Sequence, residues 1–203
     1  MLPDISDAQA KGYNTAETTG QHAGWLVERR KIIPMAERVT RVGIGYDVHA
    51  FAPPEANRRL MIGGLAIPHD RGLAGHSDAD VLLHAVVDAL LGAAALGDIG
   101  TYFPSSDARW HNASSTDFLA HTVSLLAEGG WRIENVDTTV VMEAPRLGPH
   151  VATIRAALAN ALQVAEDCIS VKGKTTDRLG FAGRSEGVAC YAVALISRPA
   201  PDE

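Results

Sequence analysis

GYDVHAF (residues 45–51), followed by GHSDADVLLHAVVDALLGAAALGDIG (residues 75–100), is the part of this sequence that decides the fold. The first stretch ends a predicted strand. The second predicts a long helix that Ser77 or Asp78 caps and that reaches about Ala95. The strand and the helix both carry polar residues of the kinds that bind metal ions, so the two elements also define a candidate site.

Asp47, His49 and His84 form a predicted divalent-metal triad. Residues two apart on a strand point to the same side, so Asp47 and His49 can converge on one ion while Val48 faces the core. His84 would reach the same ion from the helix. Two imidazoles and one carboxylate leave a tetrahedral ion one open position, which is typical of a catalytic rather than a structural metal.

The same helix carries Asp80 and Asp88, each four residues from His84, so the three residues share one helix face. Carboxylates can accept the second ring N–H of a metal-bound imidazole and so fix its orientation. We expect Asp80 and Asp88 to orient His84 in this way. The alternative is an acidic helix face that is simply solvated.

Length and composition bound the class of protein. With 203 residues, 21% charged and 46% hydrophobic, the chain is expected to form one globular domain with a sizeable core. A net charge of −6 argues against a general nucleic-acid surface, and no apolar run has the length of a membrane span. The two cysteines, Cys168 and Cys190, are too few for a disulfide framework, which favours a reducing, cytoplasmic compartment.

We divide the chain into an N-terminal extension or linker (residues 1–38), a folded domain (residues 39–198) and a C-terminal tail (residues 199–203). The extension is polar and lacks the apolar segment of a secretory signal. It contains several acidic residues, whereas a transit peptide is poor in acids, so a bacterial-type location is expected rather than a plastid.

The folded domain alternates between predicted strands and helices. Strands are expected at 39–46, 60–63, 136–142, 169–172 and 188–196, and helices at 77–95, 115–129 and 151–162. This order predicts an α+β fold, a two-layer sandwich whose mostly antiparallel or mixed sheet carries helices on one face. The last strand is apolar on both faces and needs cover on both. We expect partner subunits to cover its second face in a homotrimer around a central channel.

Two further segments can bind a ligand. Lys172–Asp177 ends as a P-loop does, but Cys168 occupies the position that requires the first glycine, so a P-loop is excluded. The small, hydroxyl-bearing and basic residues of Thr175–Arg184 can still cradle phosphates. Asp98 can accept hydroxyl groups of a polyol, and Gly100 allows a close approach of the backbone.

Taken in order, these motifs resemble the 2-C-methyl-D-erythritol 2,4-cyclodiphosphate synthase family of non-mevalonate isoprenoid biosynthesis. The likeness runs from Arg41 to about Ile196. It rests on Asp-Val-His-Ala-Phe (47–51), His-Ser-Asp-x-Asp-Val-x-x-His (76–84), Gly-Asp-Ile-Gly (97–100), Phe-Pro-x-x-Asp (103–107), Ala-Pro-Arg (144–146) and Leu-Gly-Phe-x-Gly-Arg-x-Glu-Gly (179–187).

The resemblance implies a reaction and a set of partners. The substrate would be 4-diphosphocytidyl-2-C-methyl-D-erythritol 2-phosphate, a cytidine diphosphate-linked small molecule. Its 2-phosphate would attack the β-phosphorus of its own diphosphate, releasing CMP and closing a cyclic diphosphate. Members of the family are homotrimers with active sites between adjacent subunits and a central apolar channel. No nucleic acid and no membrane is expected to take part.

The resemblance also implies roles for individual residues. The triad would hold Zn²⁺ or another divalent transition metal, and Asp177 would bind Mg²⁺ or Mn²⁺ as a second ion. His76 and Thr175 would hold the reacting phosphates as the catalytic residues. The expected substrate contacts are Ser77, Asp98, Ile99, Gly100, Phe103, Asp107, Met142, Ala144, Pro145, Arg146, Leu147, Gly148, Lys174, Thr176, Phe181 and Arg184.

Two residues depart from the family pattern. Asp177 stands where the family usually has Glu, and its side chain is one methylene shorter, which reduces its reach to the second ion. Lys174 replaces a residue that is more often Thr or another small side chain, and it adds a positive charge beside the phosphates.

Two other classes of function remain open at this stage. A metal-dependent phosphate-ester hydrolase would use the same triad to activate water. A non-catalytic trimeric binding module would need no chemistry, but it leaves the metal and phosphate motifs unexplained. Release of CMP without uptake of solvent oxygen would separate the cyclising enzyme from the hydrolase.

Overall fold

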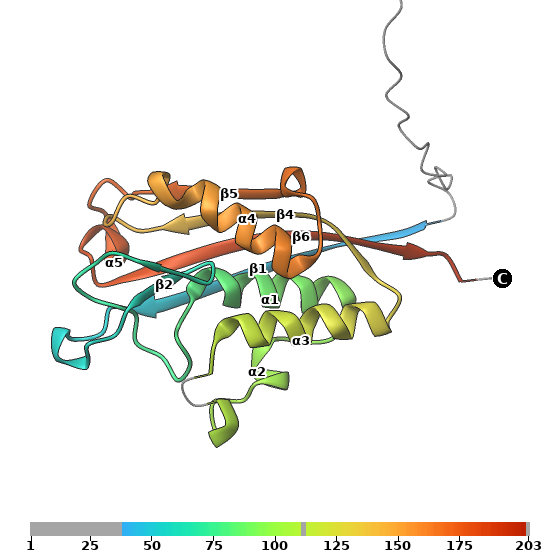
Figure 1. The fold of residues 1–203 in the computed structure, drawn as a ribbon, viewed down its shortest axis with the longest axis horizontal. Helices are drawn as coiled ribbons and strands as arrows, with labels where there is room; N and C mark the ends of the chain where they lie inside the picture. The colour runs from blue at the N-terminus through green and yellow to red at the C-terminus, as the bar shows by residue number, and fades with distance from the viewer. Residues whose placement is uncertain (1–37, 111–112, 202–203) are drawn as a thin grey trace, which may run out of the picture. The chain divides into compact units, whose positions relative to one another are not determined.

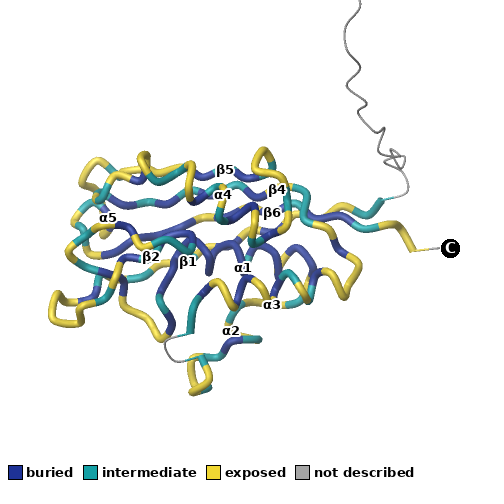
Figure 2. The backbone as a smooth tube through the Cα atoms, in the orientation of Figure 1, coloured by how far each residue is buried: buried dark blue, intermediate teal, exposed yellow. Residues whose placement is uncertain are grey.

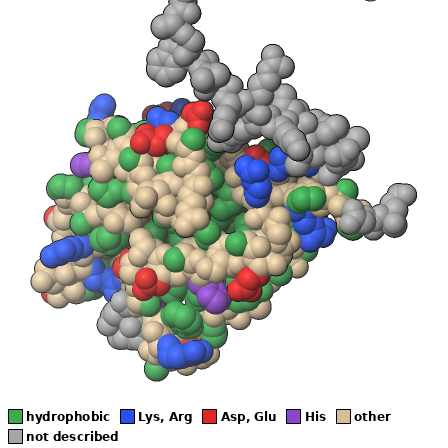
Figure 3. Space-filling view, turned by 45° about the vertical axis from the view of Figure 1, so that its right-hand side comes forward, with side chains coloured by type: hydrophobic (Ala, Val, Ile, Leu, Met, Phe, Trp, Pro, Cys, Tyr) green, Lys and Arg blue, Asp and Glu red, His purple; other side chains and the backbone are tan. Residues whose placement is uncertain are grey.

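The computed structural model describes residues 38–110 and 113–201. The expected N-terminal extension therefore lies outside the described residues, apart from its last residue, Arg38, which begins the first strand. None of the helices that the structure describes is long and apolar enough to cross a membrane. On the face drawn in Figure 3, Lys and Arg side chains form several small groups rather than one continuous basic surface.

One mixed four-stranded sheet forms the frame of the described residues, with the strand order β1-β6-β4-β5 (Figure 1). β1 (Arg38–Ala50) pairs antiparallel with β6 (Gly187–Pro199). β6 also pairs antiparallel with β4 (Arg132–Val141), and β4 pairs parallel with β5 (Ile169–Lys174). The predicted α+β class with a mixed sheet is confirmed.

Helices cover one face of this sheet (Figure 1). α1 (Val81–Ala94) packs on β1 and β6, and α4 (Val151–Leu162) packs on β5. α3 (Ser115–Glu128) packs on α1 and also contacts α4. The remaining elements are the hairpin of β2 (Leu60–Ile62) and β3 (Leu65–Ile67), the short helices α2 (Ile99–Tyr102) and α5 (Gly180–Gly183), and 3-10 turns at Pro54–Ala56, Ala108–Trp110, Gly148–His150 and Glu166–Cys168. Only β2 among these short elements was predicted.

β1 and α1 approach each other closely because small residues face each other across the contact. A Cβ atom on Gly45 would lie 1.9 Å from the carbonyl oxygen of Ala85, and one on Gly43 would lie 2.0 Å from that of Ala89. These distances leave room for glycine alone. The close contact places the first turns of α1 directly over the end of β1, where the predicted metal ligands lie.

The other face of the sheet carries exposed apolar side chains. On β1, Val42, Ile44, Tyr46 and Val48 are between 44 and 70% exposed, and on β6 Tyr191 and Val193 are 48 and 41% exposed. Val48 was predicted to face the core, and this prediction is wrong because its side of the strand faces away from α1. The alternate residues of β6 are buried against the helices, and Figure 2 draws most of this strand in the colour of buried residues. Since its exposed and its buried side chains are both largely apolar, the strand is apolar on both faces, as predicted. Contiguous apolar surface of this kind is typical of an interface.

Two helices begin at different residues from those predicted. α1 begins after Asp80, because the Asp80 carboxylate accepts the backbone N–H groups of Leu82 and Leu83, each at 3.1 Å. α3 begins after Ser114, whose hydroxyl accepts the N–H of Thr116. A side-chain acceptor at the N-cap satisfies donors that the helix itself leaves free. Asp80 is therefore a structural residue of the helix start.

Candidate metal centre and substrate pockets

The structure brings Asp47, His49 and His84 together as predicted. Asp47 Oδ2 lies 3.0 Å from His49 Nε2 and 3.0 Å from His84 Nδ1, and the two ring nitrogens are 3.1 Å apart. In a tetrahedral zinc site with bonds of about 2.0–2.1 Å, neighbouring ligand atoms are about 3.3 Å apart. The three atoms therefore have nearly the spacing that one small divalent ion requires.

A backbone carbonyl sets the orientation of the His49 ring. His49 Nδ1 lies 2.7 Å from the carbonyl oxygen of Ala74. A carbonyl can only accept, so Nδ1 carries the proton and Nε2 directs its lone pair toward the other two ligand atoms. Gly75 permits this arrangement, because a Cβ at its position would lie 3.1 Å from His49 Cε1.

A chain of hydroxyl and carboxylate groups sets the orientation of the His84 ring. His84 Nε2 lies 2.9 Å from Ser115 Oγ and 3.2 Å from Ser77 Oγ. The Ser115 hydroxyl donates its single proton to Asp78 Oδ1, so it accepts the Nε2–H of the imidazole. His84 Nδ1 is then free to bind a metal ion. Hydrogen bonds of this kind to a ligating histidine fix its tautomer and raise its basicity.

Asp80 and Asp88 do not orient His84, so this part of the sequence prediction is wrong. The fully buried Asp80 carboxylate also accepts the N–H groups of Gly63 and Gly64, at 2.9 and 2.6 Å, and so joins the β2–β3 hairpin to the start of α1. Asp88 accepts the N–H of Ile99 at 2.8 Å and holds the start of α2. Both carboxylates accept N–H groups from other segments of the chain. The spacing of residues along α1 does not predict these partners.

The charges within the triad favour a bound cation. Burial would raise the pKa of the Asp47 carboxyl, but hydrogen bonds from the His49 and His84 rings in their protonated form, whose protons a metal ion would displace, lower that pKa far below its usual range. Burial also opposes the charged form of His49, whereas its hydrogen bond with Asp47 raises the His49 pKa above the ordinary value. The carboxylate is therefore anionic, and three lone pairs converge on a point that only a proton or a metal ion can occupy. The residues present fit a divalent metal.

A pocket of about 240 Å³ opens beside the triad. The pocket is lined by His76, Ser77, Ile99, Gly100 and Phe103, together with Ser105, Trp110 and Phe118. The first five were predicted as catalytic or substrate-binding residues, and these roles stay predictions. The pocket combines the metal ligands, two hydroxyl groups and a further imidazole with an aromatic wall. It can hold a small polar molecule whose charged end faces the metal.

Two acidic residues that were predicted to contact substrate have partners of their own. Asp98 is the N-cap of α2, and its carboxylate accepts the N–H and the hydroxyl of Thr101 at 2.9 and 2.8 Å. Asp107 forms an exposed ion pair with Arg109, with atoms 2.6 Å apart. A contact of either carboxylate with substrate therefore stays a prediction.

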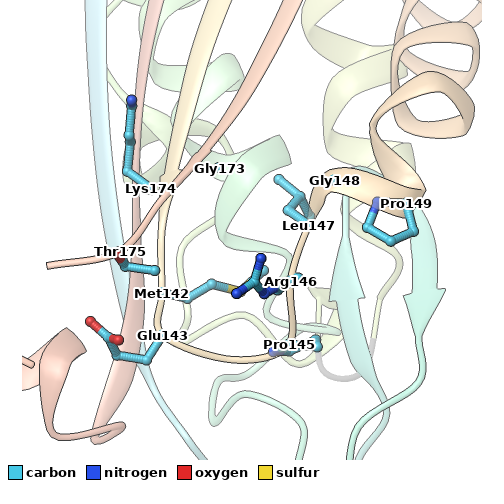
Figure 4. Close-up of a pocket in the computed structure, with 10 residues that line it drawn as sticks. All are labelled: Met142, Glu143, Pro145, Arg146, Leu147, Gly148, Pro149, Gly173, Lys174 and Thr175. Atoms are coloured by element: carbon cyan, nitrogen blue, oxygen red, sulfur yellow. The ribbon is translucent and has the colours of Figure 1, made fainter. Parts of the chain in front are cut away.

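A second, larger pocket of about 780 Å³ lies between the ends of β4 and β5 and the loop that follows β4 (Figure 4). It is lined by residues that the sequence predicted to contact substrate or to hold its phosphates, namely Met142, Pro145, Arg146, Leu147, Gly148, Lys174 and Thr175, and Glu143, Pro149 and Gly173 complete it. Predicted Ala144 is an exposed residue of the same loop. The catalytic residues expected from the sequence are thus divided: His76 lies beside the triad, and Thr175 lines the second pocket.

The remaining predicted residues lie around the loop that follows β5. Thr176 and Phe181 line a small pocket of about 200 Å³ together with Tyr46 and Tyr191 of the exposed sheet face. The side chain of Arg184 pairs with Glu186 at 2.7 Å. Asp177 has a left-handed backbone, with φ of 51°, and its carboxylate lies 3.5 Å from the Thr175 hydroxyl.

Three residues that support the triad pocket through hydrogen bonds were not recognised as site residues from the sequence. Asp78 and Ser115 complete the hydrogen-bond chain of His84, but Asp78 lies in the loop before α1, and Ser115, which was interpreted from the sequence only as a helix cap, is the first residue of α3. Arg58 donates to the carbonyl of Ser77 from the loop after β1. Asp78 lies inside the 76–84 motif, which was the one available signal.

The fold and the triad define a metal-dependent enzyme, because oriented ligand atoms converge beside a pocket that can hold a polar substrate. The family model described as the YgbB family matches residues 40–197. The chain belongs to this family.

Comparisons with individual proteins agree with this placement. The 2-C-methyl-D-erythritol 2,4-cyclodiphosphate synthase of Pseudomonas aeruginosa (strain UCBPP-PA14) is 53% identical over 156 residues, which make up 77% of this chain and 98% of that protein. The bifunctional IspDF from Campylobacter jejuni matches with a TM-score of 0.75 and 37% identity over 79% of this chain, which spans only 43% of that protein. IspF from Plasmodium falciparum, in a CDP complex, matches with a TM-score of 0.68 and 33% identity over 80% of this chain and 97% of its own.

Proposed function

We propose that this chain converts 4-diphosphocytidyl-2-C-methyl-D-erythritol 2-phosphate to 2-C-methyl-D-erythritol 2,4-cyclodiphosphate and CMP. An oxygen of the 2-phosphate attacks the β-phosphorus, and the bond from that phosphorus to the oxygen bridging it to the CMP phosphorus breaks. The observation that carries the proposal is the convergence of Asp47, His49 and His84 beside a polar pocket, in a chain whose relatives are named for this product.

The triad would hold Zn²⁺ or another divalent transition metal, and Asp177 would contribute to binding Mg²⁺ or Mn²⁺. Such ions neutralise phosphate charge and align the reacting groups. The protein supplies the orientation: Ala74 and Ser115 fix the two imidazoles. His76 and Ser77 line the pocket beside the metal ligands and would hold the reacting phosphates.

The two pockets fit the two ends of the substrate. The smaller pocket, with Ile99, Gly100 and the Phe103 ring, suits the methylerythritol end next to the metal. The larger pocket offers Arg146 and Lys174 as cations, with backbone groups of the loop after β4, and suits the cytidine end. The CDP bound by the Plasmodium falciparum protein supports the presence of a cytidine-diphosphate site on this fold.

A homotrimer would unite the two ends. In a single chain, His76 and Thr175 line different pockets, although both are needed at the reacting phosphates. The exposed apolar face of β1 and β6 provides a surface through which copies of the chain can associate around an axis. Each active site would then combine the triad of one subunit with the Thr175 loop of its neighbour.

The division of the chain and its location complete the proposal. Residues 1–38 are an extension to a catalytic domain of residues 39–198, followed by a short tail. The free thiols of Cys168 and Cys190 fit a reducing cytoplasm.

Product analysis in ¹⁸O-labelled water tests the reaction. The expected result is equimolar CMP and cyclic diphosphate, with no ¹⁸O in either product, because the nucleophile comes from the substrate. One labelled oxygen in a ring-opened product would instead establish the phosphate-ester hydrolase that uses the same triad. Unchanged substrate in the presence of zinc and magnesium would contradict both enzymes.

A further inference from the structure

Glu143 connects the end of β4 to the loop that follows β5. Its Oε1 atom accepts the backbone N–H of Thr176 at 2.9 Å and that of Arg178 at 3.2 Å. The Thr176 hydroxyl has one proton, which is shared between Glu143 Oε1 at 3.2 Å and the Leu179 carbonyl oxygen at 2.6 Å. One carboxylate oxygen thus serves two amides of the same loop.

The backbone of this loop needs such support. Asp177 and Arg178 are consecutive non-glycine residues with φ of 51° and 66°. L-residues rarely adopt the left-handed region, and two in succession persist only when the surrounding structure holds them. Glu143 accepts the N–H groups of Thr176 and Arg178, the residues that flank Asp177. The carboxylate therefore stabilises the left-handed conformation of this loop directly. The same hydrogen bonds hold the pKa of the Glu143 carboxyl below its usual range, so the acceptor is ionised at neutral pH.

The supported loop forms part of the larger pocket. Thr175, the residue before the first bonded amide, lines that pocket, and so do Lys174 and Glu143 itself. Figure 4 shows Glu143 and Thr175 next to each other at one end of the pocket, with Lys174 extending away from Arg146. The N–H of Met142 also bonds to the Lys174 carbonyl at 2.9 Å, so the ends of β4 and β5 are joined just before the loop begins. Glu143 thus binds the amide group that follows Thr175, in addition to this link between the ends of the two strands.

We infer that Glu143 is a positioning residue, which holds the Thr175–Arg178 loop in the conformation that presents Thr175 to the phosphates of a nucleoside diphosphate in the larger pocket. This inference rests on the proposed function for the identity of the ligand. It assigns Glu143 no contact with the reacting atoms. It predicts that the metal triad, which lies in the other pocket, is independent of Glu143.

The test compares Glu143→Gln and Glu143→Ala with the parent, using CDP as the probe. Glu143→Ala removes the acceptor from both amides, and a hydrogen bond to a charged group corresponds to roughly a tenfold or greater change in an equilibrium. We therefore expect CDP affinity to fall about 10-fold or more in Glu143→Ala and less in Glu143→Gln, whose amide oxygen still accepts. Hydrogen exchange at the Thr176 and Arg178 amides should accelerate in the same order. Zinc content should stay at the parental value.

Glu128→Gln is the matched control, because Glu128 is an exposed residue at the end of α3. It should leave CDP affinity, amide exchange and zinc content unchanged. Parental CDP affinity in Glu143→Ala would overturn the inference, even if the two amides exchange faster, because the loop would then not position the ligand. If Glu143→Ala is unstable at ambient temperature, the comparison is made at reduced temperature, where parental CDP affinity in Glu143→Ala would overturn the inference equally. These measurements use no turnover, so they are independent of whether the parent forms the cyclic product.

Discussion

The triad pocket and the larger pocket are built in different ways. The triad pocket rests on regular structure: two ligands lie on β1, the third lies on α1, and glycine–alanine contacts hold the two elements together. The larger pocket is formed by loops at the ends of β4 and β5, where a carboxylate supports a left-handed backbone. Regular elements place ligand atoms within a narrow tolerance, as metal binding requires. The end of β5 and the loop after it can vary in sequence, as at Lys174 and Asp177, without disturbing the metal ligands.

The largest effect is expected from the triad itself. His84→Ala should remove the ion while the fold is retained, since the ring is lost from a helix that the core still holds. Metal ions contribute several kcal/mol to the stabilisation of phosphate transition states, so turnover should fall about 10³-fold or more. Metal analysis and turnover in the presence of zinc and magnesium measure this. His121→Ala, at an exposed residue of α3, is the control. Full activity in metal-free parent enzyme would contradict the role of the triad.

Mixing experiments test whether the two pockets belong to one active site. His84→Ala and Thr175→Ala should each be inactive alone, but co-assembled subunits should regain up to about one quarter of parental activity, because one site in four then has an intact half from each subunit. Two triad variants, His84→Ala and Asp47→Ala, should regain nothing on mixing. A fully active monomer in sedimentation at assay concentration would refute the shared site.

The close contact of β1 with α1 should dominate stability. Gly45→Ala places a Cβ 1.9 Å from a backbone oxygen, and backbone cannot move aside as a side chain can. We expect a loss of about 1–3 kcal/mol in the free energy of unfolding, measured by denaturant titration, together with weaker metal binding. Gly92→Ala, at an exposed position of α1 with its nearest neighbour atom 4.0 Å away, should instead gain about 0.5–1 kcal/mol. Equal changes in the free energy of unfolding for the two variants would show that the close β1–α1 contact does not dominate stability.

A comparison of two polar residues separates support of the metal from support of the fold. Ser115→Ala removes the acceptor of the His84 N–H and should weaken metal binding by roughly 10–100-fold. Asp80→Asn leaves that acceptor intact but replaces one of the two oxygens that four backbone donors use. Asp80→Asn should lower the free energy of unfolding by about 1–3 kcal/mol, while its zinc affinity should stay close to that of the parent. A specific loss of metal affinity in Asp80→Asn would restore the interpretation made from helix spacing.

The smallest effect is expected from the extension. Deleting residues 1–36 should leave assembly and turnover nearly intact, because every residue of the triad and of both pockets lies after Arg38. Sedimentation and a turnover assay measure the two properties. A truncated chain that no longer assembles would assign the extension a structural role.

Prediction from the sequence was accurate where local pattern carries the information. The order of the long elements, the mixed sheet and the triad follow from alternation, helix periodicity and the Asp-x-His spacing, each of which is a property of neighbouring residues. It failed for Asp80 and Val48. Helix spacing predicted that Asp80 orients His84, but the Asp80 carboxylate accepts backbone N–H groups from the β2–β3 hairpin instead. Val48 is apolar, and its local pattern does not show which of the two apolar faces of the sheet the helices cover.

By itself the sequence determined the class of fold, the family and the three candidate metal ligands. Only the tertiary structure decided which groups orient those ligands. Asp78 and Ser115 are 37 residues apart, and Glu143 lies 33 residues from the first amide that it accepts. Hydrogen bonds depend on atoms meeting within about 3 Å in a favourable direction. The spacing of residues along the chain predicts hydrogen-bond partners within one helix or strand. Partners on separate elements are decided by how those elements pack.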